Sequence, residues 1–236
     1  MPQRHMPLPL FRDILSRLPP GQHTVSLQGE GEPLTHPEFW EMVKLVEQRG
    51  CIPYTITNGS KIDPERMGLH FPWIGVSLDT LDTDEAHRIG RYKLPVVLKN
   101  LKILFESYGA HRVIIHTVDY GQDVQAIKNF VATHRGVRHI IQALQRKDDY
   151  AYRYRDLVLP STDSAHYTYR CRYIDTPRMR FYNIDGIEMP CCFIKDTNRF
   201  VSITHIKDAL VNKNIPDCCR GCRELTTPAQ LARRSV

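Results

Sequence analysis

Six of the seven cysteines in this 236-residue chain fall within residues 171–222. They are Cys171, Cys191, Cys192, Cys218, Cys219 and Cys222. The N-terminus has no apolar signal core and no small-residue cleavage site, so we expect a cytoplasmic protein whose thiols stay reduced. Reduced cysteines gathered in this way are typical of a metal site rather than of a disulfide set. Four converging thiolates can hold a tetrahedral zinc ion or an iron–sulfur cluster.

The spacing of these cysteines follows the pattern C-x14-G-x4-C-C-x25-C-C-x2-C, in which the glycine is Gly186. Residues 178–182 and 188–193 flank the pair Asp185-Gly186 and predict a β-hairpin that turns at this pair. Adjacent cysteines seldom both reach one metal, because successive side chains of a strand point to opposite faces. Spacing alone leaves the choice between Cys218 and Cys219 open.

The composition is that of an ordinary globular protein, with 42% hydrophobic residues, 25% charged residues and a net charge of +6. No apolar run approaches the roughly 20 residues needed to cross a bilayer, so we expect no membrane partner. Much of the positive charge lies between residues 146 and 180, where arginines are interspersed with tyrosines. A nucleic-acid surface can have this composition, but we favour a solvated connector beside the metal site and expect no nucleic-acid partner.

Upstream of the cysteines, short apolar runs alternate with amphipathic stretches. Strands are predicted at residues 23–27, 52–56, 72–78, 112–118 and 138–143, and helices at residues 7–18, 36–48, 94–108 and 124–135. This alternation predicts an α/β fold with a parallel sheet flanked by helices. The periodicity fades near residue 150, so we divide the chain into an α/β domain, residues 1–150, and a cysteine-rich domain, residues 151–236.

Polar and glycine-rich residues follow three of the predicted strands. They are Gln28-Gly29-Glu30-Gly31-Glu32-Pro33 after the first strand, Thr57-Asn58-Gly59-Ser60 after the second, and Ser77 and Asp79 at the end of the third. In α/β folds, ligands bind beyond the carboxyl ends of the strands. Three such strand ends in succession predict a binding site there.

The order of these motifs resembles a known family. Gly29-Glu30-Gly31-Glu32-Pro33-Leu34, Thr57-Asn58-Gly59 and Ser77-Leu78-Asp79 resemble successive landmarks of radical S-adenosylmethionine (SAM) enzymes. The cysteine-rich tail resembles the SPASM or twitch extension of some members, which holds an auxiliary [4Fe-4S] cluster. The resemblance spans residues 7–225. It implies an incomplete parallel (β/α) barrel of the radical SAM type, related to the TIM barrel, with a small α+β extension.

The resemblance also implies a SAM site. Gly31, Glu32 and Pro33 match the family's GGEP motif, which contacts the amino group of the methionine part of SAM. Ser77 and Asp79 match positions that meet the ribose hydroxyls, and Thr57 and Asn58 line the same face. The chain departs from the motif at its first position, where Glu30 stands in place of glycine.

In the tail, the resemblance implies that Cys171, Cys191, Cys219 and Cys222 bind the auxiliary cluster. Gly186 then supplies the turn that brings Cys191 back toward Cys171. Cys192 and Cys218 are extra cysteines under this assignment, and Cys218 is the rival of Cys219. A structural zinc ion bound by the same cysteines is the alternative cofactor.

One landmark of the family is missing from this sequence. Radical SAM enzymes are defined by a CxxxCxxC loop that holds the SAM-cleaving cluster, and upstream of Cys171 this chain has only Cys51. We therefore expect this polypeptide not to cleave SAM. It is either a shortened form of a radical SAM enzyme or a natural derivative that lost the chemistry. Because Glu32, Asn58 and Asp79 persist, we favour the shortened form.

Two functions follow from these observations. In its full form, the resemblance implies an enzyme that generates a 5′-deoxyadenosyl radical, modifies a peptide or a small molecule and needs an electron donor. The alternative is a non-catalytic structural or interaction module with a four-cysteine zinc site. Whether this chain itself is an enzyme stays open, and the sequence identifies no catalytic residue.

Overall fold

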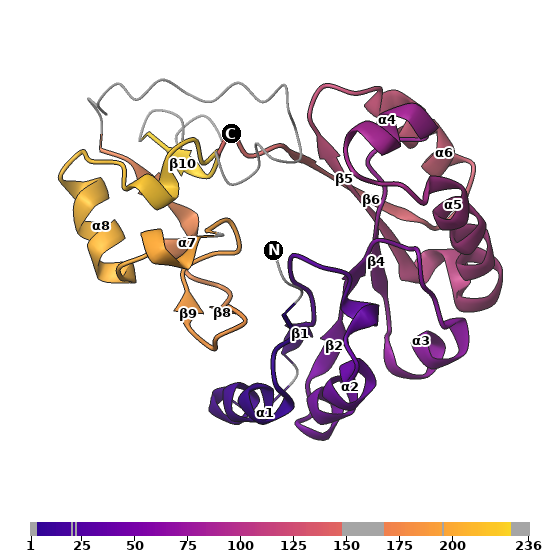
Figure 1. The fold of residues 1–236 in the computed structure, drawn as a ribbon, viewed down its shortest axis with the longest axis horizontal. Coiled ribbons are helices and arrows are strands. Elements are labelled where there is room, and N and C mark those ends of the chain that lie inside the picture. Colours follow the sequence, from indigo (N-terminus) through magenta and orange to yellow (C-terminus); the bar gives the residue numbers. More distant parts are fainter. Residues whose placement is uncertain (1–3, 20, 22, 148–167, 195, 228–236) are drawn as a thin grey trace. The chain divides into compact units, whose positions relative to one another are not determined.

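The computed structural model describes residues 4–19, 21, 23–147, 168–194 and 196–227. The chain divides into two compact units, Met1–Ala143 and Leu144–Val236. Figure 1 shows an α/β first unit and a smaller second unit with short strands and helices. The expected boundary at residue 150 falls outside the described residues, and contacts group Leu144 with the second unit.

The first unit is built on parallel strands that follow one another in chain order. They are β1 (Thr24–Ser26), β2 (Ile52–Tyr54), β3 (Ile56–Thr57), β4 (Ile74–Ser77), β5 (Val113–Asp119) and β6 (Arg138–Ala143). β1 pairs with β2, and β3, β4, β5 and β6 form a four-stranded sheet in that order. All of these neighbours are parallel, which confirms the predicted parallel sheet. The incomplete barrel stays a prediction.

The predicted second strand is interrupted at Thr55, which separates β2 from β3. Thr55 still takes part in the sheet, because its carbonyl accepts a hydrogen bond of 2.9 Å from the backbone N–H of Gly75. Its hydroxyl donates to the carbonyl of Leu27 at 2.6 Å. These bonds continue the sheet from β2 into β3.

Helices connect the strands of the first unit. They are α1 (Leu8–Arg17), α2 (Phe39–Gln48), α3 (Pro64–His70), α4 (Thr83–Arg88), α5 (Leu94–Ile103) and α6 (Val124–Ala132). α3, α4 and α6 begin after Asp63, Asp82 and Asp123, whose side chains accept hydrogen bonds from the backbone three residues later. Within the described residues, no helix has both the length and the apolar character that a membrane crossing requires.

The two faces of the sheet differ in character. Along β2 and β3, buried and half-buried residues alternate from Cys51 to Ser60, as expected of a strand with one open face. The buried face carries the main core, which includes Val43, Ile74, Val76, Leu101, Ile115 and Ile127, all with no exposed surface. Tyr54, Ser77 and His116 are half-buried, and Ser77 is paired with His116 in the β4–β5 register.

The second unit has an α+β character with short strands. β7 (Arg170–Cys171) pairs with β10 (Leu225–Thr226), and β8 (Phe181–Tyr182) pairs with β9 (Glu188–Met189), both antiparallel. The helices are α7 (Arg172–Asp175) and α8 (Ile203–Val211), with short 3₁₀ turns at Thr197–Arg199 and Asp217–Cys219. β8 and β9 confirm the predicted hairpin.

The hairpin turn depends on Gly186 and Asn183. Gly186 has a φ of 77°, a conformation that glycine adopts without strain. The side chain of Asn183 accepts backbone hydrogen bonds from Asp185 at 3.0 Å and from Ile187 at 2.7 Å. The Asp-Gly signal was therefore a correct predictor of the turn.

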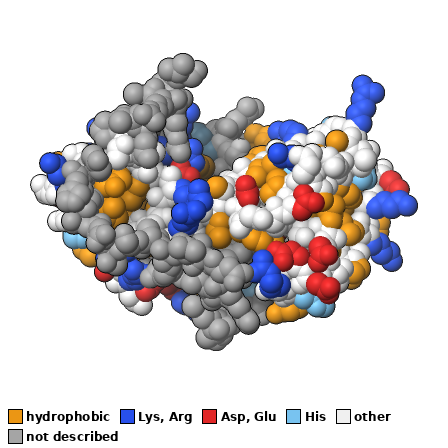
Figure 2. Space-filling view, turned by 90° about the horizontal axis from the view of Figure 1, so that it is seen from above, with side chains coloured by type: hydrophobic (Ala, Val, Ile, Leu, Met, Phe, Trp, Pro, Cys, Tyr) orange, Lys and Arg blue, Asp and Glu red, His pale blue; other side chains and the backbone are white. Residues whose placement is uncertain are grey.

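Surface charge is mixed where the structure can be described. On the face seen in Figure 2, Lys and Arg side chains lie among Asp and Glu side chains. Residues 148–167, which make up much of the Arg/Tyr-rich stretch, lie outside the described residues.

Candidate functional site

The carboxylate of Glu32 joins the loop after β1 to the end of β3. Its Oε1 accepts hydrogen bonds from the Thr57 hydroxyl at 2.6 Å and from the Leu34 backbone at 3.2 Å. Its Oε2 accepts from the backbone N–H of Asn58 at 2.6 Å. The structure therefore brings together three residues that the sequence analysis assigned to one site. Both oxygens of Glu32 are engaged in positioning these loops.

The residues before Glu32 leave space above their backbone. Gly29, Glu30 and Gly31 are exposed, while Pro33 begins a short 3₁₀ turn, Pro33–Thr35. A Cβ added to Gly29 or Gly31 would meet no other atom within 4 Å. A ligand can therefore approach this backbone closely, as the predicted SAM site requires.

The loop after β3 is fixed by a glycine and an asparagine. Gly59 has a φ of 74°, and a Cβ there would lie 3.0 Å from Val97 and 3.1 Å from Val76. The side chain of Asn58 accepts from the backbone of Ser60 at 2.8 Å. The Asn-Gly pair is thus required by the loop geometry.

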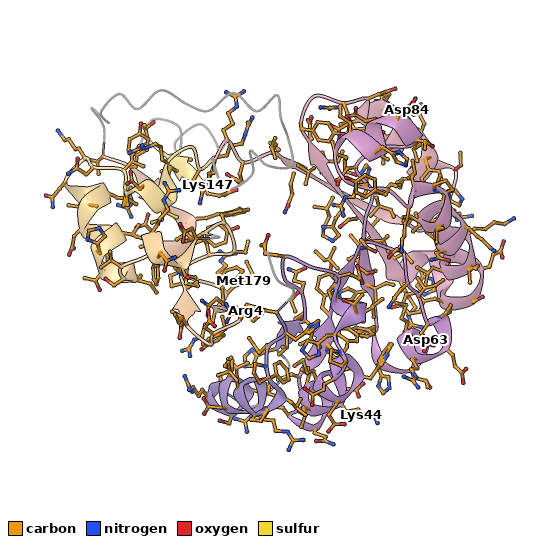
Figure 3. The ribbon with its side chains drawn as sticks, viewed as in Figure 1. Arg4, Lys44, Asp63, Asp84, Lys147 and Met179 are labelled. Carbon is orange, nitrogen blue, oxygen red and sulfur yellow. The ribbon has the colours of Figure 1, made fainter. Side chains whose placement is uncertain are left out.

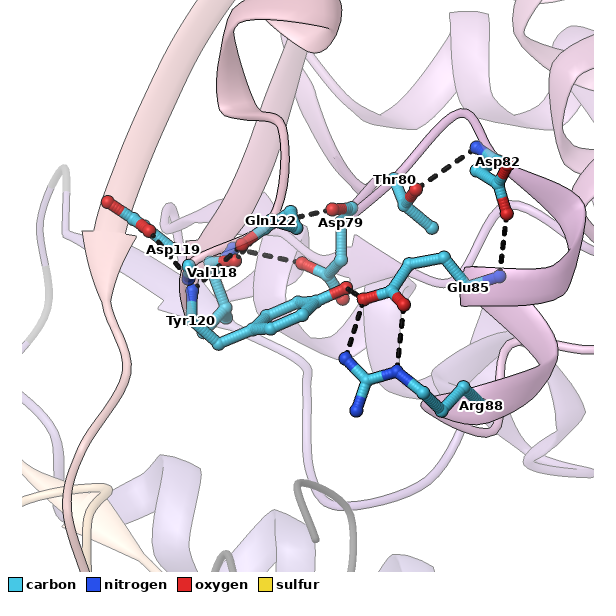
Figure 4. Close-up of polar contacts among 10 residues, drawn as sticks. Asp79, Thr80, Asp82, Glu85, Arg88, Val118, Asp119, Tyr120 and Gln122 are labelled. Atoms are coloured by element: carbon cyan, nitrogen blue, oxygen red, sulfur yellow. Dashed lines mark hydrogen bonds and ion pairs between the residues drawn. The ribbon is translucent and has the colours of Figure 1, made fainter. Parts of the chain in front are cut away.

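Asp79 is 3% exposed and lies within a network of hydrogen bonds between two strand ends. Its Oδ2 accepts from the guanidinium of Arg91 at 2.8 and 3.2 Å, and its Oδ1 accepts from the backbone of Val118 at 2.9 Å. Gln122 donates to its carbonyl at 2.8 Å (Figure 4). The carboxylate therefore connects the end of β4 to the end of β5.

A second ion pair lies beside this network. Arg88 and the hydroxyl of Tyr120 both donate to Glu85, and these bonds lower the pKa of Glu85 to about 2 (Figure 4). Glu85 is thus a carboxylate at neutral pH and holds the start of α4 against the loop after β5. Among the predicted ribose contacts, Asp79 is enclosed by these groups, whereas Ser77 lies on the half-buried face of the sheet.

Tyr54 and His116 form a polar pair on the half-buried face that sequence analysis did not identify. The Tyr54 hydroxyl lies 2.8 Å from Nε2 of His116. Burial raises the pKa of Tyr54 to about 12, and burial together with nearby His139 lowers the pKa of His116 to about 4. Both groups are therefore neutral at pH 7, and the hydroxyl donates to the imidazole.

In the second unit, five of the cysteines line one cavity. Cys171, Cys191, Cys218, Cys219 and Cys222 surround a narrow space with a cavity volume of about 10 Å³. Cys192 is exposed and is not part of the lining. In the first unit, Cys51 packs in an apolar cluster with Phe11 and Val46, as expected of a structural cysteine.

The residues of this cavity come from separate parts of the chain. Cys171 lies in β7, Cys191 follows β9, and Cys218 and Cys219 lie in the turn Asp217–Cys219. Within the described ranges, no group of three His, Cys, Asp or Glu side chains is arranged around a single point as ligands of one metal ion. The assignment of four ligands among the five cysteines stays a prediction.

The cavity changes the acidity of its thiols. Burial raises the pKa of Cys171 and Cys191, and raises the pKa of Cys222 to about 11. The Sγ atoms of Cys218 and Cys219 lie 3.9 Å apart, and their hydrogen bond lowers the pKa of Cys218 while raising that of Cys219. A cation in the cavity would favour the thiolates, so metal binding would release protons.

Lys147 also lines this cavity, a role that sequence analysis did not predict. It is 1% exposed, and its ammonium group donates to the carbonyls of Phe193 at 2.5 Å and Cys218 at 2.7 Å. Lys147 is labelled in Figure 3. A lysine after an apolar strand is predicted to be a surface residue, since lysines are almost never fully buried. The cavity thus combines cysteines with a buried cation.

No protein-family model and no curated protein matches this chain. Similar solved structures include archaeal TYW1, which is 23% identical with a TM-score of 0.38 and covers 48% of this chain and 39% of that chain. TYW1 with a lysine-pyruvate adduct bound is 22% identical with a TM-score of 0.39, covering 52% and 46% of the two chains.

Streptococcus suis SuiB bound to S-adenosylmethionine is 15% identical with a TM-score of 0.41, covering 83% of this chain and 56% of that chain. The matched regions span less than two thirds of the TYW1 and SuiB chains. These similarities are partial, with TM-scores of 0.38, 0.39 and 0.41.

Proposed function

We propose that this chain is a radical SAM/SPASM-type protein. Its second unit binds an auxiliary [4Fe-4S] cluster through Cys171, Cys191, Cys219 and Cys222, and its first unit binds SAM at the carboxyl ends of the strands. The observation that carries the proposal is the cavity, around which cysteines from separate segments gather.

The donor set of the cavity fits a [4Fe-4S] cluster. Such a cluster is bound by four cysteine thiolates, each of which ligates a different iron. Its ligands therefore approach it from several sides, and the cysteines here line one cavity from separate segments of the chain. The apolar residues of the lining, among them Phe193 and Ile206, would keep water away from the cluster. When bound, the cluster supplies a centre that accepts an electron or positions the substrate.

The SAM site follows from the Glu32 network. Because the Glu32 carboxylate is engaged by Thr57 and Asn58, we assign it the role of holding the loop. The ammonium group of SAM then binds backbone carbonyls of the exposed residues 29–31, together with Pro33 at their end. Ser77 meets the ribose, and Asp79 acts through Arg91 and the Val118 backbone to position the loop after β4.

Reductive SAM cleavage needs three further thiolates close together, and upstream of Cys171 this sequence has Cys51 alone. We therefore propose that this polypeptide binds SAM without cleaving it. A longer form that carries the cluster loop would act on a peptide or small molecule and would take electrons from a donor protein.

Anaerobic reconstitution with iron and sulfide tests the proposal. A brown protein with about four irons per chain supports the cluster. A colourless protein that binds one zinc ion instead would replace it with the alternative, a four-cysteine zinc module without catalytic activity. Binding of SAM, measured separately by calorimetry, tests the first unit.

A further inference from the structure

Residues 144–147, here called the bridging segment, contact the backbone next to several cysteines. The Lys147 ammonium donates to the carbonyl of Phe193, two residues after Cys191, and to the carbonyl of Cys218 itself. These two carbonyls belong to different cysteine-bearing segments. The ammonium therefore connects one segment to the other through two hydrogen bonds.

The same segment also contacts the third group of cysteines. The side chain of Gln145 accepts a hydrogen bond of 2.7 Å from the backbone N–H of Arg223, the residue after Cys222. The carbonyl of Leu144 accepts from the Arg223 guanidinium at 2.6 Å. Leu144 and Gln145 are 7% and 6% exposed, so the accepting residues of both bonds are buried, whereas the donor Arg223 is exposed.

Cys171 is attached to this arrangement by a different route. It is paired with Leu225 of β10, three residues after Cys222. Its backbone N–H donates to Asp175 at 3.1 Å. Bonds from the bridging segment thus reach the segments that carry Cys191, Cys218, Cys219 and Cys222, and β10 brings in Cys171.

Lys147 also brings a positive charge to the cavity that the cysteines line. A cation that is 1% exposed is shielded from solvent, and its field acts strongly on groups that line the same cavity. A metal centre bound by four thiolates carries negative charge. Net charge and hydrogen bonding around an iron–sulfur cluster set its reduction potential, because the reduced state carries one more negative charge.

We propose that the bridging segment positions the cysteines and that Lys147 makes the centre they bind easier to reduce. This inference rests on the proposed function, because it requires that the cysteines bind a cluster or a metal ion. Lys147 acts here as a positioning and charge-compensating residue, without being a ligand.

The test compares wild type with Lys147→Met, Lys147→Gln and Lys147→Arg after anaerobic reconstitution. Lys207→Met, at an exposed position of α8 in the same unit, is the matched control. We expect the Met and Gln variants either to lose most of the metal while remaining folded or to bind a cluster of lower potential. The reduction equilibrium should change at least tenfold, which corresponds to a shift in reduction potential of about 59 mV for one electron. Lys147→Arg and Lys207→Met stay close to wild type.

The possible failures are distinguishable. If wild type itself binds neither iron nor zinc, the proposed function fails and this inference fails with it. If wild type binds a cluster and the Met and Gln variants match it in content and potential, only the role of Lys147 is overturned. If wild type binds zinc alone, zinc affinity is measured by competition with a chelator instead of the reduction potential. An unchanged zinc affinity in both variants would then overturn the role of Lys147. Loss of folding in both variants before metal is added would also overturn it.

Discussion

The hydroxyl of Tyr54 and Nε2 of His116 meet at 2.8 Å above Gly75. A Cβ at Gly75 would lie 2.7 Å from the Tyr54 oxygen and 2.9 Å from Cδ2 of His116. Residues from three strands therefore share one small volume, and the absence of a side chain at Gly75 allows the hydrogen bond.

We predict that Gly75→Ala destabilises the first unit. The added methyl group would collide with Tyr54, Ile56 and His116, and overpacking of this kind costs about 1–3 kcal/mol. Urea unfolding gives the free-energy difference. The matched control is Gly68→Ala, because a Cβ at Gly68 in α3 meets no atom within 4 Å and alanine should stabilise the helix by about 0.5–1 kcal/mol. Equal effects of the two substitutions would contradict the prediction.

His116 makes the stability of the protein depend on pH. Its pKa falls from 6.5 to about 4 on folding, chiefly through burial. The folded state therefore resists protonation of His116 more than the unfolded state does. The contribution of neutral His116 to the free energy of unfolding is complete above pH 6.5 and is lost as the pH falls toward 4. At 1.36 kcal/mol per pKa unit the full loss amounts to roughly 3.4 kcal/mol.

The free energy of unfolding of wild type and of His116→Gln is measured between pH 7 and pH 4. The difference between the two curves separates the contribution of His116 from that of the carboxylates, which both proteins share. Wild type should lose more free energy of unfolding than the variant over this interval. Parallel curves would show that burial does not hold His116 neutral. An imidazole titration by NMR gives the pKa directly.

We predict that Glu32→Gln weakens SAM binding at least tenfold. An amide cannot accept the Asn58 N–H with the NH₂ half of its side chain, and hydrogen bonds to a charged group contribute about 1.5–3 kcal/mol. Calorimetric titration with SAM measures the Kd. Glu38→Gln, an exposed glutamate without a capping bond at the start of α2, should leave the Kd unchanged. An unchanged Kd in Glu32→Gln would remove the loop-holding role.

We predict that Cys191→Ala and Cys222→Ala each abolish metal loading, since each removes a thiolate from the cavity. Cys51→Ala and Cys192→Ala serve as controls, because neither residue lines the cavity. Iron and zinc content per chain is the measurement. Full loading of either cavity variant would mean that the ligand set is wrong. The same measurement on Cys218→Ala and Cys219→Ala decides between these two residues.

With SAM and dithionite, we expect this chain to form no 5′-deoxyadenosine. Upstream of Cys171 its one thiol is Cys51, which is 5% exposed and packed among apolar side chains. Chromatography of the reaction mixture detects the product, and an active radical SAM enzyme in a parallel reaction shows that the assay works. Turnover by this chain would contradict this prediction.

Periodicity in the sequence was enough to predict most elements of the first unit. The predicted strand at residues 138–143 coincides with β6, and the predicted helix at residues 94–108 corresponds to α5 and the π turn Leu104–Gly109. α3 and α4, at 7 and 6 residues, are too short to show a helical period. Their capping residues, Asp63 and Asp82, were the signals that could have revealed them.

The candidate sites were partly predictable for a related reason. Glu32 lies in the loop after β1, and Thr57 and Asn58 lie at the end of β3, which follows directly on β2, the parallel partner of β1, so their proximity could be expected. Tyr54 and His116 are 62 residues apart, and their contact depends on a register that no local pattern encodes. Lys147 is buried by contacts with residues 46 and 71 positions later, which a local reading of the sequence cannot anticipate.

The bridging segment also bears on where the protein can be divided for biochemical work. A fragment cut at residue 151, as the fading periodicity suggests, would lack Leu144, Gln145 and Lys147 and with them the bonds to Phe193, Cys218 and Arg223. A fragment that carries the cysteine-rich unit for spectroscopy should therefore start at or before Leu144.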